Sequence, residues 1–115
     1  MEVHPEYNRI LVELEQAESA RSVGNEGMAR VCARRAAGIA AGVYISRNGY
    51  QFSGTGAYDR LKYLCEIPGI SPEIKSVAEH FLVRVTPDHT LPIEADLIEE
   101  ARWLTNNLLD LPQKL

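Results

Sequence analysis

Three arginines in the middle of the chain are the first candidates for chemistry. Arg30 and Arg34 are four residues apart, and Arg35 follows directly. On a helix, residues at i and i+4 lie on one face, where like charges repel each other unless acids or an anion lie between them. Two interpretations stay open. The arginines pair with acids such as Glu13, Glu18 or those near the end of the chain, or they contact the phosphate of a nucleotide or RNA.

The charge of the chain is distributed unevenly. The net charge of −4 argues against a surface that binds nucleic acid as a whole, and the sequence carries no DNA-binding signal. Residues 20–62 hold seven basic and two acidic residues, giving +5, whereas residues 1–19 carry −4 and residues 63–115 carry −5. This order predicts helices that pair electrostatically, within one subunit or across a dimer. A local anion site on the basic segment is the alternative.

Other chemistries find little support in the sequence. Cys32 and Cys65 form no CxxC motif, and no cysteine or histidine pair has a zinc spacing, so we predict two buried free thiols and no metal. The glycines of residues 50–56 lack the Lys-Ser/Thr ending of a phosphate-binding loop, and no predicted strand precedes them. No Ser-His-Asp or paired-carboxylate arrangement can be assembled, and we predict no cofactor.

The sequence also argues against a membrane protein. Its longest apolar run, Ala36–Ile45, has ten residues and is too short to span a bilayer. Residues 1–16 are rich in glutamate and lack the apolar stretch of a signal peptide. We therefore expect a cytoplasmic protein.

The apolar pattern predicts five helices and no strand. Hydrophobic residues make up 45% of the 115 residues, enough for the core of one domain spanning residues 1–115. Helical spacing predicts helices over about 5–23, 26–47, 57–67, 72–85 and 92–109, with Asn25 and Ser71 as N-caps and Thr86-Pro87 ending the fourth. Short connections between them indicate an all-α, five-helix, up-and-down antiparallel bundle.

The second predicted helix carries small residues at regular spacing. Ala33, Ala37 and Ala41 recur every four residues, as do Gly38 and Gly42. Each glycine costs about 0.8–1 kcal/mol relative to alanine inside a helix. Two of them indicate that another backbone approaches closely, either inside the bundle or at a subunit interface.

Taken together, these features resemble the HEPN superfamily, the higher eukaryotes and prokaryotes nucleotide-binding domain. The segment Ala17-Glu-Ser-Ala-Arg21 leads to the Gly24-Asn25 break, and an Ala-rich, Arg-bearing second helix ends near Tyr44-Ile-Ser-Arg-Asn-Gly49. A shorter helical pair and a closing helix follow, so the resemblance covers about residues 7–109. It implies a helical bundle that forms homodimers. It also implies a minimal nucleotidyltransferase as partner, often in a toxin–antitoxin system.

Some HEPN members are metal-independent ribonucleases with an Arg-x(4–6)-His motif, and Arg84-Val-Thr-Pro-Asp-His89 has this spacing. The resemblance implies that Arg84 would stabilise phosphate charge and that His89 would act as base or acid on the ribose 2′-hydroxyl. His80, one helical turn before Arg84, could join this cluster. The segment departs from the family pattern at Val85, where a polar residue is common, and at Pro87. In the alternative interpretation, Arg84 pairs with an acid and His89 lies in an exposed loop.

The sequence favours a non-catalytic HEPN-like helical module that dimerises and binds a partner protein or a nucleotide. A ribonuclease using Arg84 and His89 is the alternative. A purely structural subunit of a larger complex is a third hypothesis.

Overall fold

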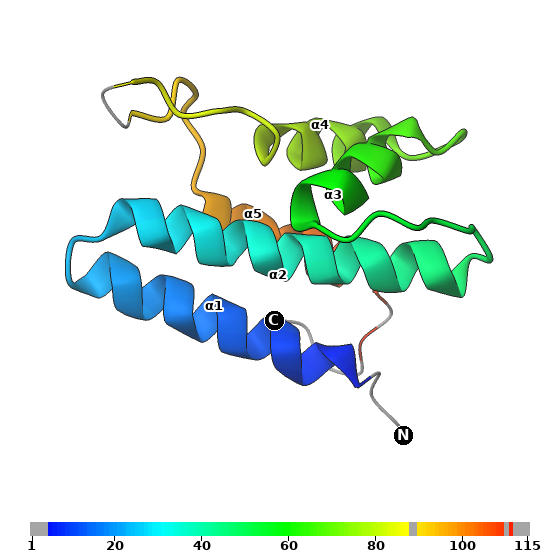
Figure 1. Ribbon diagram of the computed structural model, residues 1–115, viewed down its shortest axis with the longest axis horizontal. Helices are drawn as coiled ribbons and strands as arrows, with labels where there is room; N and C mark the ends of the chain where they lie inside the picture. The colour runs from blue at the N-terminus through cyan, green and yellow to red at the C-terminus, as the bar shows by residue number, and fades with distance from the viewer. Residues whose placement is uncertain (1–4, 88–89, 110, 112–115) are drawn as a thin grey trace.

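The computed structural model describes residues 5–87, 90–109 and 111, and over these residues the regular secondary structure is all α-helix, with no strand (Figure 1). The all-α prediction is confirmed. The five helices are α1 (Glu6–Ser22), α2 (Glu26–Arg47), α3 (Ala57–Glu66), α4 (Pro72–His80) and α5 (Leu97–Leu108).

The longest helix, α2, lies at the centre of the molecule. It pairs with α1 in an antiparallel hairpin whose turn contains Gly24, at φ +80°, and Asn25, whose side chain accepts the amide N–H of Met28. The positive φ of Gly24 is a conformation that side-chain-bearing residues avoid. The opposite faces of α2 pack against α1, α3 and α5, so that eleven of its residues are buried, six of them alanines. A helix rich in alanine lets three neighbours approach one axis.

The small-residue face of α2 is explained inside the subunit. A Cβ atom at Gly38 would lie 2.5 Å from the Cβ and 2.7 Å from the Cα of Ala57, the first residue of α3. A Cβ at Gly42 would lie 3.3 Å from the Cδ atom of Arg60. Gly38 therefore marks a backbone contact between α2 and α3, and this face is not available to a second subunit.

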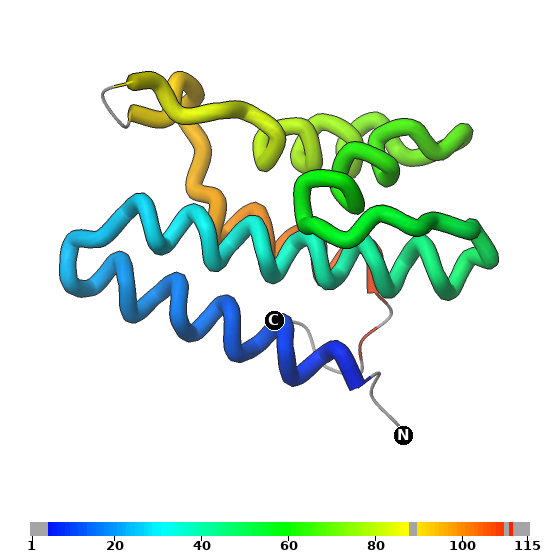
Figure 2. Tube along the Cα trace, viewed as in Figure 1, coloured from blue at the N-terminus to red at the C-terminus, as the bar shows by residue number. Residues whose placement is uncertain are grey.

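The same contacts correct the predicted up-and-down order. Along α2, Gly38 precedes Gly42, and along α3 their neighbours Ala57 and Arg60 follow in the same order, so the two helices run in the same direction. The connection of residues 48–56 runs back along α2 before α3 begins (Figure 2). The length of this connection lets the chain return halfway along α2, which a short helix–helix turn would not.

The fourth helix is shorter than predicted. It ends at His80, and Phe81 through Thr86 have no helical structure. The side chain of Phe81 is fully buried, and its carbonyl oxygen accepts a hydrogen bond from Nε of Arg34. Because Val83, Val85 and Thr86 are β-branched and Pro87 follows, an extended chain is favoured after this point.

The fifth helix begins at Leu97, five residues later than predicted. The carboxylate of Asp96 caps it by accepting the amide N–H groups of Ile98 and Glu99. Asp96 also pairs with Arg21 at 2.9 Å, and Arg21 binds Glu26 at 2.6 Å. This three-residue cluster joins the ends of α1, α2 and α5 where the segment 81–96 returns to the bundle.

Candidate functional site

A pocket of about 560 Å³ lies between the N-terminal half of α2 and the segment that follows α4. From α2 come Gly27, Arg30, Val31 and Arg34. The other wall is formed by Tyr58 of α3, by Leu82, Arg84, Val85 and Leu91 of the segment, and by Leu97 of α5. Two arginines of α2 and a third from a distant part of the chain therefore face one largely apolar hollow, which we call the arginine pocket.

Arg34 is the best-fixed of the three arginines. It is half-buried, and its Nε–H donates to the carbonyl oxygen of Phe81 at 2.9 Å, 47 residues away in the chain. This bond attaches the segment after α4 to α2. The two terminal nitrogens of Arg34 have no acceptor among the described residues, so they remain available to a ligand.

The charges of Arg30 and Arg84 are likewise not paired with an acid among the described residues. Arg30 is half-buried one turn before Arg34, and Arg84 is exposed on the opposite wall. Within the described part of the chain, neither forms a hydrogen bond or ion pair, and no aspartate or glutamate lines the pocket. Like charges at i and i+4 destabilise a helix by roughly 0.2–0.5 kcal/mol. A bound anion would relieve this repulsion.

Two of the predicted site residues lie elsewhere. Arg35 is turned towards α1, where its guanidinium lies 4.0 Å from the carboxylate of Glu13, as the ion-pair interpretation predicted. His80 contacts α5, where its Nδ1 lies 2.8 Å from Oε1 and 3.0 Å from Oε2 of Glu100. His80 therefore does not join Arg84, and it does not line the arginine pocket.

His89, the second half of the predicted Arg84–His89 pair, lies outside the described residues. Arg84 does not lie in the fourth helix, where the predicted range of about 72–85 placed it. It lies in non-helical chain four residues after α4 ends.

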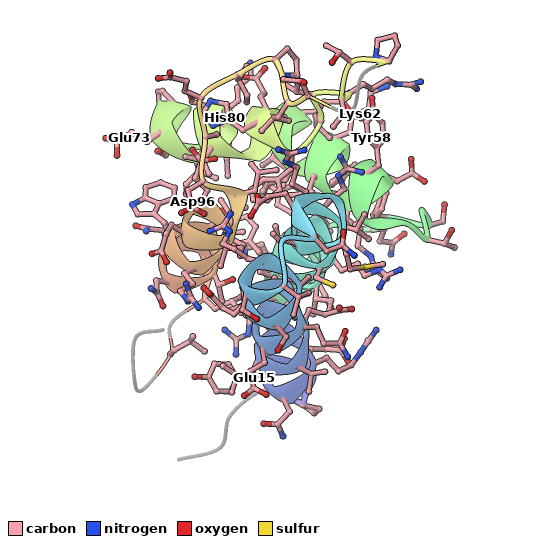
Figure 3. The ribbon with its side chains drawn as sticks, turned by 90° about the vertical axis from the view of Figure 1, so that its left-hand side faces the viewer. Glu15, Tyr58, Lys62, Glu73, His80 and Asp96 are labelled. Carbon is pink, nitrogen blue, oxygen red and sulfur yellow. The ribbon has the colours of Figure 1, made fainter. Side chains whose placement is uncertain are left out.

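Tyr58 is the functional candidate that the sequence did not reveal. Its side chain is 41% exposed and lines the arginine pocket. Figure 3 shows Tyr58 and Lys62 together on α3, while His80 and Asp96 lie on the other side of the view. An aromatic residue next to a lysine at i+4 is the signal that could have indicated a nucleic-acid or nucleotide contact.

The sequence also made predictions about metal binding and about the two cysteines. Among the described residues no group of three metal-binding side chains occurs. Cys32 is buried as predicted, whereas Cys65 is half-buried, and burial raises the pKa of both thiols. Thiols with raised pKa values are poor nucleophiles.

Of the two glycines in the loop before α3, Gly54 serves packing. A Cβ at Gly54 would lie 2.1 Å from Cζ of Phe52, so this glycine makes room for an aromatic ring. None of the helices, over the part of the chain that the structure describes, is long and apolar enough to cross a membrane.

Comparison with protein-family models, curated proteins and solved structures finds no match to this chain. The function must therefore be argued from the arginine pocket itself.

Proposed function

We propose that this protein is a non-catalytic HEPN-like helical module that binds a nucleotide in the arginine pocket. The convergence of Arg30, Arg34 and Arg84 on one hollow, with no acidic residue among its described lining, carries this proposal. Guanidinium groups bind phosphate oxygens through charge-assisted, often bidentate hydrogen bonds. Tyr58, Val31 and Val85 supply apolar surface of the kind on which a nucleobase packs.

The described wall of the pocket favours binding over catalysis. It holds three arginines and one tyrosine but no histidine, carboxylate, cysteine or lysine that could act as general base near neutral pH. The alternative activity, cleavage of RNA by Arg84 and His89, would require His89 to supply that base. Incubation of RNA with the wild type and with His89→Ala separates the two functions. Cleavage that is lost in His89→Ala would replace our proposal with the ribonuclease.

Equilibrium binding tests the proposed nucleotide site. We expect AMP and ATP to bind more tightly than adenosine, because adenosine offers no charge to the arginines. Loss of one charge-assisted hydrogen bond costs about 1.5–3 kcal/mol, so Arg34→Gln and Arg84→Gln should each weaken ATP binding by at least tenfold. Arg35→Gln removes the same charge one residue away from Arg34, outside the pocket, and should leave binding unchanged. Equal losses in all three variants would indicate non-specific attraction and contradict the proposal.

We further propose that the module acts as a homodimer, with a minimal nucleotidyltransferase as its partner. The small-residue face of α2 no longer supports dimerisation, since α3 covers it. Support comes instead from exposed apolar side chains on α1 and α2, where Val12 is 50% and Met28 46% accessible. Light scattering after size exclusion should give twice the mass of 12.8 kDa for the wild type, and the monomer mass for the double variant Val12→Glu, Met28→Glu. A wild-type monomer at micromolar concentration would contradict the dimer.

A further inference from the structure

A second pocket, of about 520 Å³, lies at the other end of α2. It is enclosed by the start of α1, the C-terminal half of α2, the connection of residues 48–56 and Arg60 of α3. It shares no residue with the arginine pocket. Its size falls within the range of roughly 300–1,000 Å³ typical of small-molecule sites.

Arg60 provides the charge of this second pocket. Its half-buried side chain lies across Gly42, where the absence of a Cβ lets the Cδ and Nε atoms approach the helix backbone. In the described part of the chain, Arg60 has no hydrogen-bond or ion-pair partner. Among the described residues of the wall, Glu6 is the one acid, and it is ion-paired with Arg9. The pocket therefore presents a half-buried arginine whose charge is not balanced by a neighbour among the described residues.

Two aromatic side chains line the pocket together with Arg60. Tyr50 and Phe52 both line the pocket, and both contact Tyr63 of α3, with ring centroids 6.3 Å and 4.7 Å apart. The Phe52 ring is also held against Gly54, where a Cβ would lie 2.1 Å from Cζ. These contacts fix the rings before any ligand arrives, which reduces the entropy lost on binding.

We propose that this pocket binds a small aromatic carboxylate. The carboxylate would accept two hydrogen bonds from the Arg60 guanidinium, a bidentate geometry that matches its planar fork. The ring of the ligand would lie against Tyr50 and Phe52 in an offset or edge-to-face arrangement. A single unpaired guanidinium near Glu6 suits a ligand of one negative charge better than a doubly charged phosphate. Ser46 and Gln51, which also line the pocket, offer groups for hydrogen bonds to ring substituents.

Titration of the wild-type protein with benzoate, followed by proton–nitrogen NMR, tests the proposal. We expect the amide signals of Gly42 and Gly54 to shift. Benzamide, which lacks the charge, and acetate, which lacks the ring, should shift them much less. Arg60→Gln should weaken benzoate binding by about tenfold, the loss expected for one charge-assisted pair. Lys62→Gln, which removes one charge from the same helix, should bind as the wild type does.

Three results would overturn the proposal. The first is the absence of shifts at Gly42 and Gly54 with benzoate. The second is equal shifts with acetate or benzamide. The third is unchanged binding in Arg60→Gln. If Arg60→Gln does not fold, Tyr50→Leu removes an exposed aromatic edge of the wall instead, and unchanged benzoate binding in that variant would equally overturn the proposal. None of these outcomes depends on nucleotide binding in the arginine pocket.

Discussion

Arg34 makes one contact that shapes the pocket and leaves other donors for a ligand. Its Nε–H is bound to the Phe81 carbonyl oxygen, and its terminal nitrogens face the pocket without an acceptor in the described chain. A guanidinium can do both because its five N–H donors point in fixed directions. Lysine has a similar charge but no donor at this position along its side chain.

Arg34→Lys should therefore weaken nucleotide binding although the charge is kept. The Phe81 carbonyl loses its partner, which costs about 1 kcal/mol in stability, and the wall that carries Arg84 is no longer held against α2. We expect ATP affinity to fall by about tenfold and the midpoint of thermal unfolding to fall by a few degrees. Arg35→Lys is the matched control and should change neither quantity. Full retention of affinity by Arg34→Lys would show that charge alone matters.

The cluster of Arg21, Glu26 and Asp96 predicts a stability that depends on pH. Hydrogen bonds to Glu26 and Asp96 raise the pKa of Arg21 further above its already high value. Burial alone would raise the pKa of Asp96, but the hydrogen bond from Arg21 and those from the amides of Glu99 and Ile98 outweigh it, and the pKa is lowered. A carboxyl group whose pKa is lower in the folded state stabilises the fold above its unfolded pKa, about 3.9, and this stabilisation is lost as pH falls through the lower, folded value.

Asp96→Asn isolates this effect, because asparagine still caps a helix N-terminus. Chemical denaturation between neutral pH and about pH 3 measures it. We expect the wild type to be more stable than Asp96→Asn at neutral pH and the difference to shrink as the solution becomes more acidic. A difference that stays constant over this range would show that the charge of Asp96 contributes nothing.

At the scale of helices, the contact between α2 and α3 depends on the absence of a side chain. Gly38 lies so close to Ala57 that an added Cβ would overlap backbone as well as side-chain atoms. Gly27, on the same helix, has only the Asn25 side-chain oxygen within 4 Å, at 3.9 Å. A methyl group therefore has no room at Gly38 but has room at Gly27.

Gly38→Ala should destabilise the protein by about 1–3 kcal/mol, because overpacking outweighs the gain of nearly 1 kcal/mol in helix propensity. Gly27→Ala should stabilise it by up to about 1 kcal/mol, since the propensity gain meets no steric cost. Urea denaturation of both variants measures the two signs. A stabilised Gly38→Ala would mean that α3 is not held against α2 as described.

The helix ends that the sequence predicted well are those set by neighbouring residues. Asn25 caps α2, and Gly24 and Gly49 adopt positive φ where the first two helices end. The ends that it predicted poorly depend on distant partners. The chain after α4 is held by Arg34, 47 residues away, and the start of α5 by Arg21, 75 residues away. Apolar periodicity contains no information about such contacts.

In the arginine pocket too, the sequence predicted what depends on neighbouring residues and missed what depends on distant contacts. Spacing on one helix was sufficient to select Arg30 and Arg34. Arg35 was selected with them, but successive helical residues point about 100° apart, and this turns Arg35 towards Glu13. The position of Tyr58 could not be predicted, because its exposure depends on how α3 crosses α2 and on where the segment after α4 lies.

Across the whole molecule, the acidic–basic–acidic order of the chain is partly neutralised within the fold. Basic residues of the middle region pair with acids from both flanking regions, as in Arg35 with Glu13 and Arg21 with Asp96. Such pairs are partly exposed and contribute little energy individually. Among the described residues, several cations are left out of this pairing, and the arginine pocket is the place where three of them line one hollow.

The most direct test of the nucleotide-binding pocket observes the arginine side chains themselves. Proton–nitrogen NMR resolves individual arginine Nε–H signals, and titration with ATP should shift those of Arg30, Arg34 and Arg84 along one binding curve. The Arg35 signal should stay in place, because its guanidinium faces Glu13 on another side of α2. Shifts that include Arg35 to the same extent, or no shift of the three pocket arginines at saturating ATP, would contradict the account.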